Sequence, residues 1–334
     1  MPPSPPSIAI KRLSHARSEC TVNVSPDEAL EAEKKVLHRA AQTLAIDGFR
    51  PGNAPGEMVR KKLGEDTLQQ EVVRTICLHL IPSLLQEHSL SPIIPPTLTI
   101  ASTKPLVLTL TFVEKPHVAV KRIKPIEKKD QAVEDQEVEK LIENILRQQT
   151  EEGSSPAPLT DEVAKAFGSS SAESLRADVK QSLLAQKQKQ EKQRQENLLL
   201  SHIADATEVD LAPELIAEEV NSLYGELIDR LKSANMALAE WLTHTKKSEE
   251  DLQKEFESQA LHRIKLRFGI EHLMTEKNIT ISDEKIAKEI QQYLDYLPPE
   301  EREDARKRFA SGEEGYARVR WQLMVSALIE NLLQ

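Results

Sequence analysis

The residues best suited to bind a partner lie in one segment, residues 47–56, whose sequence is DGFRPGNAPG. Phe49 and Arg50 are adjacent in it, and an aromatic ring beside a guanidinium is typical of a binding anchor. Three glycines and two prolines exclude both a helix and a strand here, so we expect an exposed, stiffened loop. From these residues alone, two interpretations remain open. Phe49 either docks on a partner or folds back onto its own domain as a hydrophobic plug.

No catalytic, cofactor or metal site is expected from the rest of the sequence. The nine histidines do not form HExxH or another metal-ligand spacing, and His262 and His272 are more typical of surface or capping residues. The sequence has no GxGxxG, Walker or GxSxG motif, and it contains only 10 glycines. Cys20 and Cys77 have no CxxC partner, so neither a disulfide scaffold nor a zinc site is indicated.

Charge and proline divide the chain near residue 125. Residues 1–125 carry 16 basic and 12 acidic side chains, a net charge of +4, whereas residues 126–334 carry 28 and 42, a net charge of −14. Fourteen of the 19 prolines also precede residue 126, which predicts a long helical part after a mixed one. No run of about 18 apolar residues is present, so we expect no membrane span. Residues 1–7 read as a disordered lead rather than a secretory signal, and the compartment expected is a reduced cytosol.

The first part of the chain should form helices on a small antiparallel sheet. Ser25 with Glu28 forms a capping box that opens a helix ending at Gly48, in which Leu30 and Leu37 mark the apolar stripe. A second helix should run over 66–88, with Pro82 imposing a kink or a break. The expected strands are 8–13, 20–24, 98–100 and 106–113. The order β-β-α-loop-α-β-β predicts an α+β domain.

The second part should be helical nearly throughout. A short helix marked by Val138–Leu146 precedes a linker at 150–158, and a capping box at Ser170 opens a helix that reaches about Asp205. Its middle, 186–197, is polar on every face, so it should project into solvent or bridge two parts of the molecule. Further helices are expected at 213–231, 249–277, 283–297 and 314–333.

The Phe49 loop (residues 47–56) resembles the ribosome-docking signature of the trigger factor family, Gly-Phe-Arg-x-Gly-Lys-x-Pro. The matching positions are Gly48, Phe49, Arg50, Gly52 and Pro55, while Pro51 and Asn53 stand where the family usually has lysine. The likeness continues in order along the chain. The segments 159–168, 174–178 and 209–213 resemble the entry to the family's helical carboxy-terminal domain and the turn before its next helix.

The resemblance implies a multidomain α+β protein. Residues 8–125 would form the ribosome-binding domain, 126–158 a connecting helix and linker, and 159–334 an extended all-α chaperone domain with helical arms. The family's peptidyl-prolyl isomerase domain, about 80–100 residues long, cannot fit into the linker and is expected to be absent. The ribosome-binding residues would be Gly48, Phe49, Arg50, Pro51, Gly52, Asn53 and Pro55.

The function implied is that of an ATP-independent, cytoplasmic chaperone without a cofactor. It would dock on ribosomal protein and RNA of the large subunit near the exit tunnel, shelter nascent or unfolded chains, and form a homodimer away from the ribosome. The Phe49 loop is itself neutral because Asp47 offsets Arg50, so Arg60-Lys61-Lys62 in the following helix could supply positive charge.

Two other functions remain open from the sequence. An isomerase would need a site formed by aromatic residues that are scattered along the chain, namely Phe167, Trp241, Phe268 and Tyr293. A helical adaptor without chaperone activity is suggested by the polar stretch 186–197, although that stretch carries no sustained heptad seam.

Overall fold

The computed structural model describes residues 7–50, 52–148 and 159–333. Their contacts divide the chain into two compact units. The first holds the described residues up to Val118 together with Val209–Ile264, and the second holds Ala119–Glu208 and Lys265–Gln334 as far as they are described. The expected lead at 1–7 and the expected linker at 150–158 lie almost wholly outside the described residues, apart from Ser7, which belongs to the first strand.

A four-stranded antiparallel sheet forms the amino-terminal part of the first unit, in the order β1-β2-β4-β3. Its strands are β1 (Ser7–Leu13), β2 (Arg17–Asn23), β3 (Thr97–Thr103) and β4 (Leu106–Val113). Cys20 lies opposite Leu110 and Val22 lies opposite Leu108, so these four buried side chains share one face. The sequence placed β4 at its observed bounds, whereas β2 begins three residues before the expected 20–24 and ends one residue earlier.

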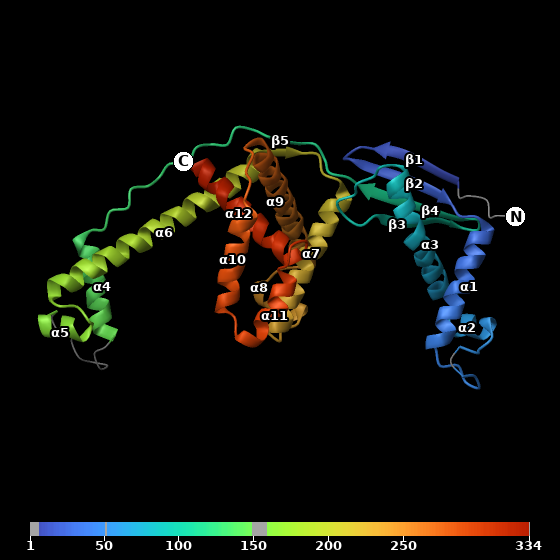
Figure 1. Cartoon of the computed structure of the whole chain (residues 1–334), viewed down its shortest axis with the longest axis horizontal. Helices are drawn as coiled ribbons and strands as arrows, with labels where there is room; N and C mark the ends of the chain where they lie inside the picture. The colour runs from blue at the N-terminus through green and yellow to red at the C-terminus, as the bar shows by residue number, and fades with distance from the viewer. Residues whose placement is uncertain (1–6, 51, 149–158, 334) are drawn as a thin grey trace. The chain divides into compact units, whose positions relative to one another are not determined.

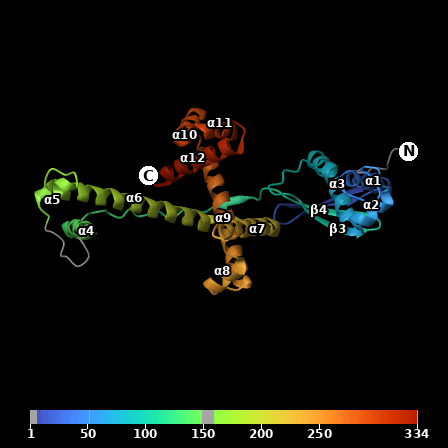
Figure 2. The ribbon, with the colours of Figure 1, turned by 90° about the horizontal axis from the view of Figure 1, so that it is seen from below.

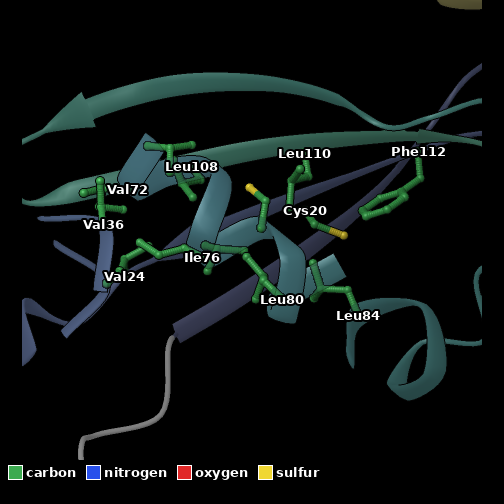
Figure 3. Packing of buried hydrophobic residues seen from close by; sticks show 14 of the residues in the cluster. Cys20, Val24, Val36, Val72, Ile76, Leu80, Leu84, Leu108, Leu110 and Phe112 are labelled. Atoms are coloured by element: carbon green, nitrogen blue, oxygen red, sulfur yellow. The ribbon is translucent and has the colours of Figure 1, made fainter. Parts of the chain in front are cut away.

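Three helices lie between β2 and β3 in the sequence: α1 (Pro26–Thr43), α2 (Gly56–Leu63) and α3 (Glu65–Glu87). Figure 1 shows α1 and α3 on the same side of the sheet. Their apolar side chains meet the inner face in a single core, in which Val36 of α1 and Ile76 and Leu80 of α3 pack against β2 and β4 (Figure 3). The expected α+β arrangement is therefore confirmed.

The start of α1 matches the expectation, but its end does not. Ser25 caps the helix by accepting a hydrogen bond from the N–H of Glu28 at 3.2 Å. The helix stops at Thr43 rather than at Gly48, and Ile46 then turns inward to pack with Val59 of α2. Leu30, expected in the apolar stripe, is 51% exposed, because Ala32 and Val36 take the core positions instead.

Helix α3 continues past Pro82 to Glu87, so of the two outcomes expected at Pro82, a kink or a break, the break does not occur. Proline removes the hydrogen bond to the carbonyl four residues earlier, which here belongs to Leu78. Leu78 lies on the exposed side of the helix, where water can replace that hydrogen bond.

The rest of the first unit is helical. It contains α7 (Pro213–Ser233), α8 (Leu238–Thr245) and the first part of α9 (Glu249–Glu276). Leucines of α7, Leu242 of α8 and Phe256 of α9 form their common core. Helix α8 was not expected, since eight residues offer few positions for a helical period to show.

The second unit contains a pair of short strands and six complete helices among its described residues. The strands β5 (Val118–Val120) and β6 (Thr207–Val209) pair with each other, and all their residues except Val118 and Val209 belong to this unit. The helices are α4 (Asp135–Gln148), α5 (Asp161–Ala166), α6 (Ala172–Ala206), α10 (Asp283–Tyr296), α11 (Pro299–Arg308) and α12 (Glu314–Leu333). Helix α6 is capped by Ser171, one residue after the expected position.

Helix α6 bridges two apolar clusters, as its polar middle suggested. Near its amino-terminal end, Val179 packs with Val138 and Ile142 of α4, and Figure 2 shows α4 and α5 beside that end. Near its carboxy-terminal end, Leu199 and Ile203 pack with residues of α9 and α12.

The polar middle of α6 holds an extended segment of the same chain rather than facing only solvent. Glu191 accepts the N–H of Lys129 at 2.9 Å, and Arg194 donates to the carbonyl oxygen of Glu127 at 2.8 Å. Lys187 donates to the carbonyl of Ala132, also at 2.8 Å. These hydrogen bonds attach the extended segment 127–132 to the middle of α6, where the helix has no apolar stripe.

Candidate functional site

The Phe49 loop joins α1 to α2, and backbone hydrogen bonds fix its course. The N–H of Phe49 donates to the carbonyl of Ile46 at 3.1 Å, and the N–H of Asn53 donates to the carbonyl of Arg50 at 3.0 Å. A third bond runs from the N–H of Gly52 to the carbonyl of Ala41 in α1, at 2.8 Å. The loop is therefore shaped by its own backbone and tied to a helix.

Two glycines in the loop are required by the backbone rather than by packing. Gly48 has a φ of +86° and Gly52 a φ of +89°, both in the left-handed region that other residues rarely adopt. A Cβ atom at either position would meet no heavy atom within 4 Å. Glycine thus allows the two sharp turns that place residues 49 and 50 between them.

The apolar side chains at the two ends of the loop hold it against the domain. Ile46 is buried with Ala41 of α1 and Val59 of α2, and Ala54 packs against the same cluster. Phe49 lies outside that cluster and is 40% exposed. The interpretation of Phe49 as a plug is therefore not supported, because Ile46 and Ala54 occupy the interior instead.

Arg50 is also exposed, and its guanidinium has no ion-pair partner within the part of the chain that the structure describes. Gly48, Gly52, Asn53 and Pro55 are exposed as well, while Pro51 lies outside the described residues. The loop thus presents an aromatic ring and a cation together, in a backbone that needs little ordering when it binds.

Positive charge beside the loop comes from two of the three basic residues of α2. Arg60 is engaged by Glu33 at 2.6 Å and by Glu65 at 3.3 Å. Lys61 and Lys62 are exposed and have no ion-pair partner among the described residues. They follow the exposed Met58 by three and four positions, which places all three on one face of α2.

A groove between α7 and α9 is a second candidate binding surface, which the sequence did not reveal. Its volume is about 860 Å³, and its larger apolar lining residues are Ile216, Val220 and Tyr224 of α7 and Leu261 of α9. Tyr224 also meets the ring of Phe256 edge-on, at 4.7 Å between ring centroids. A helical period shows which face is apolar, but it does not show how much of that face a neighbouring helix covers.

Among the described residues we find neither a cluster of metal ligands nor a helix that could span a membrane. They contain no group of three or more His, Cys, Asp or Glu side chains placed to hold a metal ion. None of their helices combines the length and the apolar character needed to cross a bilayer. Cys20 and Cys77 are both free and buried, and burial raises the pKa of each thiol.

Comparisons with known proteins identify the same family over nearly the whole chain. The family described as bacterial trigger factor protein matches residues 7–145, and the family described as its C-terminus matches residues 171–333. A trigger factor of Thermomicrobium roseum is 26% identical over 142 residues, which is 42% of this chain and 29% of that protein. One from Marinobacter nauticus is 30% identical over 147 residues, which is 42% of this chain and 34% of that one.

These first relatives are thus matched over about a third of their own length, but another is matched more fully. A trigger factor of Carboxydothermus hydrogenoformans is 21% identical over 83% of this chain and 88% of its own. A solved structure of the trigger factor chaperone shares the fold, with a TM-score of 0.58, 19% identity, and coverage of 98% of this chain and 99% of that one.

The segment between the two matched regions is short. Only residues 146–170 separate them, and such a segment is too short for a domain with its own core. The family members' middle isomerase domain is therefore absent from this position. The chain belongs to the trigger factor family, in a form that lacks the isomerase domain.

Proposed function

We propose that this protein is an ATP-independent chaperone of the cytoplasm that docks on the ribosome near the exit tunnel and shelters nascent or unfolded polypeptides. The Phe49 loop is the docking element, with Gly48, Phe49, Arg50, Pro51, Gly52, Asn53 and Pro55 as its ribosome-binding residues. In this proposal residues 8–125 form the docking domain, 126–158 the connection, and 159–334 the chaperone domain, and the protein can form a homodimer away from the ribosome.

One observation supports the docking role: Phe49 and Arg50 are exposed together in a loop whose described residues are held by backbone hydrogen bonds. Two left-handed glycines and three backbone hydrogen bonds set the conformation before any partner is present. A preordered loop loses little conformational entropy on binding, so the ring and the guanidinium can act as anchors. The free lysines of α2 then complement ribosomal RNA, whose phosphates attract cations in a salt-dependent manner.

The helical region supplies a surface suited to unfolded chains. The α7–α9 groove presents Ile216, Val220, Tyr224 and Leu261, and its lining also includes the charged residues Lys254 and Glu257. Such a surface can bind apolar segments of many sequences through burial of apolar area, which is not directional. The solved relative is described as recognising substrates promiscuously. We propose that the α7–α9 groove gives the present chain the same kind of recognition.

An isomerase or an adaptor function fits the molecule less well. The aromatic residues Phe167, Trp241, Phe268 and Tyr293 come from four different helices or helix ends, and only Phe268 is fully buried. The polar middle of α6 is engaged by its own chain through Glu191 and Arg194. We therefore propose that the protein has no isomerase activity of its own and that α6 is a structural bridge.

Two measurements on the full chain test the proposal. Stoichiometric amounts should suppress aggregation of a chemically denatured protein without ATP, and the chain should cosediment with ribosomes. Val220→Asp should weaken the first activity because it puts a charge into the groove, while leaving cosedimentation unchanged. A chain that neither suppresses aggregation nor binds ribosomes would refute the proposal, and turnover of a proline-containing peptide would show that it is an enzyme.

A further inference from the structure

We propose a second polypeptide-binding site on the amino-terminal sheet, where an extended, uncharged segment of an unfolded chain adds as a strand to the free edge of β3. The inference rests on the proposed chaperone function and gives it a second point of contact, separate from the α7–α9 groove. It is carried by an uncovered apolar face, a groove beside that face, and an edge strand without charge.

The helices leave the inner face of β3 uncovered. Leu98 lies opposite Leu110 and Ile100 lies opposite Leu108, so both β3 side chains point to the face that α1 and α3 cover. Yet Leu108 and Leu110 are fully buried, whereas Leu98 and Ile100 are each 38% exposed. The helical layer therefore ends over β4, one strand short of the sheet edge.

The uncovered face forms one wall of a groove of about 420 Å³, and α3 forms the other. Val73, Cys77 and Ile81 line it from α3, and Leu98 and Ile100 line it from β3. Among all its lining residues only Arg74 is charged, and Arg74 pairs with Glu71 in the same helix at 3.6 Å. The groove can therefore accept apolar side chains without placing a charge in an apolar environment.

The edge itself lacks the usual protection against strand addition. β3 is the last strand of the sheet, so one row of its backbone N–H and C=O groups has no strand partner among the described residues. Its sequence, TLTIAST, contains no charged residue and no proline. The opposite edge strand, β1, carries Lys11 and Arg12, the kind of residue that discourages pairing with another chain.

An unfolded segment fits this edge better than a second copy of the protein does. The register of β3 shifts between Ile100 and Ser102, which marks a bulge near the middle of the strand. Two rigid, bulged edges could pair only over Thr97–Ile100, too short a contact for the roughly 1,200 Å² that a stable dimer buries. A flexible chain can follow the bulge, form backbone hydrogen bonds whatever its sequence, and place alternate apolar side chains in the groove.

The test uses the full chain and a fluorescent peptide of alternating valine and threonine as the probe. Ile100→Lys puts a charge at the inner face of the edge, and Thr99→Lys puts the same charge on the opposite face of the same strand. We expect Ile100→Lys to weaken peptide binding about tenfold or more, and Thr99→Lys to change it less than about twofold. Equal binding by the two variants would overturn the proposal.

Hydrogen exchange on the unmodified chain provides a measurement that does not depend on how the variants fold. Addition of the peptide should slow amide exchange in Thr97–Thr103, and unchanged exchange there would also overturn the site. A sedimentation coefficient that rises with protein concentration would show self-association of the chain. If Ile100→Lys abolishes that rise, a second copy occupies the edge and the proposal is overturned. If Ile100→Lys leaves aggregation suppression and ribosome cosedimentation intact while peptide binding is unaffected, only this site fails and the proposed function stands.

Discussion

The N–H of Gly52 donates a hydrogen bond to the carbonyl oxygen of Ala41, with 2.8 Å between the two atoms. This bond joins the second turn of the Phe49 loop to the last turns of α1. Because Gly52 has a φ of +89°, the conformation that makes the bond is one that glycine adopts without strain. The presentation of Phe49 and Arg50 thus depends on the backbone conformation at Gly52.

Replacing Gly52 should therefore weaken ribosome binding although both anchors remain. Gly52→Ala adds about 1–2 kcal/mol of strain at a left-handed position, which favours other loop conformations. We expect ribosome affinity to fall several-fold with an unchanged circular dichroism spectrum. Gly56→Ala is the matched control, since Gly56 has ordinary backbone angles and a Cβ there would meet only Leu37, at 3.9 Å. Equal losses in the two variants would show that preordering by Gly52 is unimportant.

The free lysines of α2 should determine how strongly salt affects ribosome binding. Removing one phosphate contact lowers the slope of log affinity against log salt by about 1, so Lys61→Gln/Lys62→Gln should reduce the slope by about 1–2. Lys34→Gln/Lys35→Gln removes the same charge from α1 and should change the slope less. Titrations at several salt concentrations measure both slopes. A slope unaffected by the α2 substitutions would place the RNA contacts elsewhere.

The attachment of residues 127–131 to α6 should depend on pH through Glu191. Hydrogen bonds from Arg194 and from the N–H of Lys129 lower the pKa of Glu191 from 4.5 to about 2. A lowered pKa means that the ionised carboxylate stabilises the folded state fully above pH 4.5 and less as the pH falls toward 2. Hydrogen exchange at Lys129, corrected for its intrinsic rate, should show protection at pH 5 and reduced protection near pH 2.

Glu191→Gln provides the control for that titration. The amide cannot ionise, so protection at Lys129 should be weaker at pH 5 and should change little between pH 5 and pH 2. If wild type and variant lose protection in parallel on acidification, another group governs the attachment.

Two helical glycines should respond in opposite ways to the same substitution. A Cβ at Gly269 in α9 would lie 2.2 Å from Oγ1 of Thr207 and 2.9 Å from Cγ2 of Ile203, so Gly269→Ala should destabilise the protein by about 1–3 kcal/mol. Gly225 in α7 has no heavy atom within 4 Å of that position, and Gly225→Ala should stabilise by about 0.5–1 kcal/mol. Urea unfolding measures both, and destabilisation by Gly225→Ala would contradict the packing seen here.

The sequence predicted the elements that local chemistry determines. The side chain of Ser25 accepts a hydrogen bond from an otherwise unpaired N–H at the start of α1. Cys20 and Val22 alternate with polar residues, which matches a strand with one buried and one exposed face. The elements set by tertiary packing were predicted less well. The end of α1 moved because Ile46 is buried against Val59, a contact between residues 13 positions apart that no helical period records.

The candidate sites divide in the same way. Gly48 and Gly52 could be recognised because a loop rich in glycine and proline has few alternatives, and the adjacent Phe49 and Arg50 then suggested an anchor. The exposure of Phe49 needed the structure, since only packing shows that Ile46 takes the interior position. The surfaces at Val220 and Ile100 were not predictable, because each depends on where a neighbouring helix ends.

Cosedimentation of the double variant Phe49→Ala/Arg50→Ala with ribosomes tests the central claim most directly. Leu30→Ala/Lys34→Ala is the matched control, since it removes an exposed apolar side chain and an exposed cation from α1 of the same domain. With circular dichroism unchanged for all three proteins, we predict that wild type and control sediment with ribosomes and that the double variant stays in the supernatant. Sedimentation of the double variant to the same extent as wild type would contradict the assignment of the Phe49 loop as the docking element.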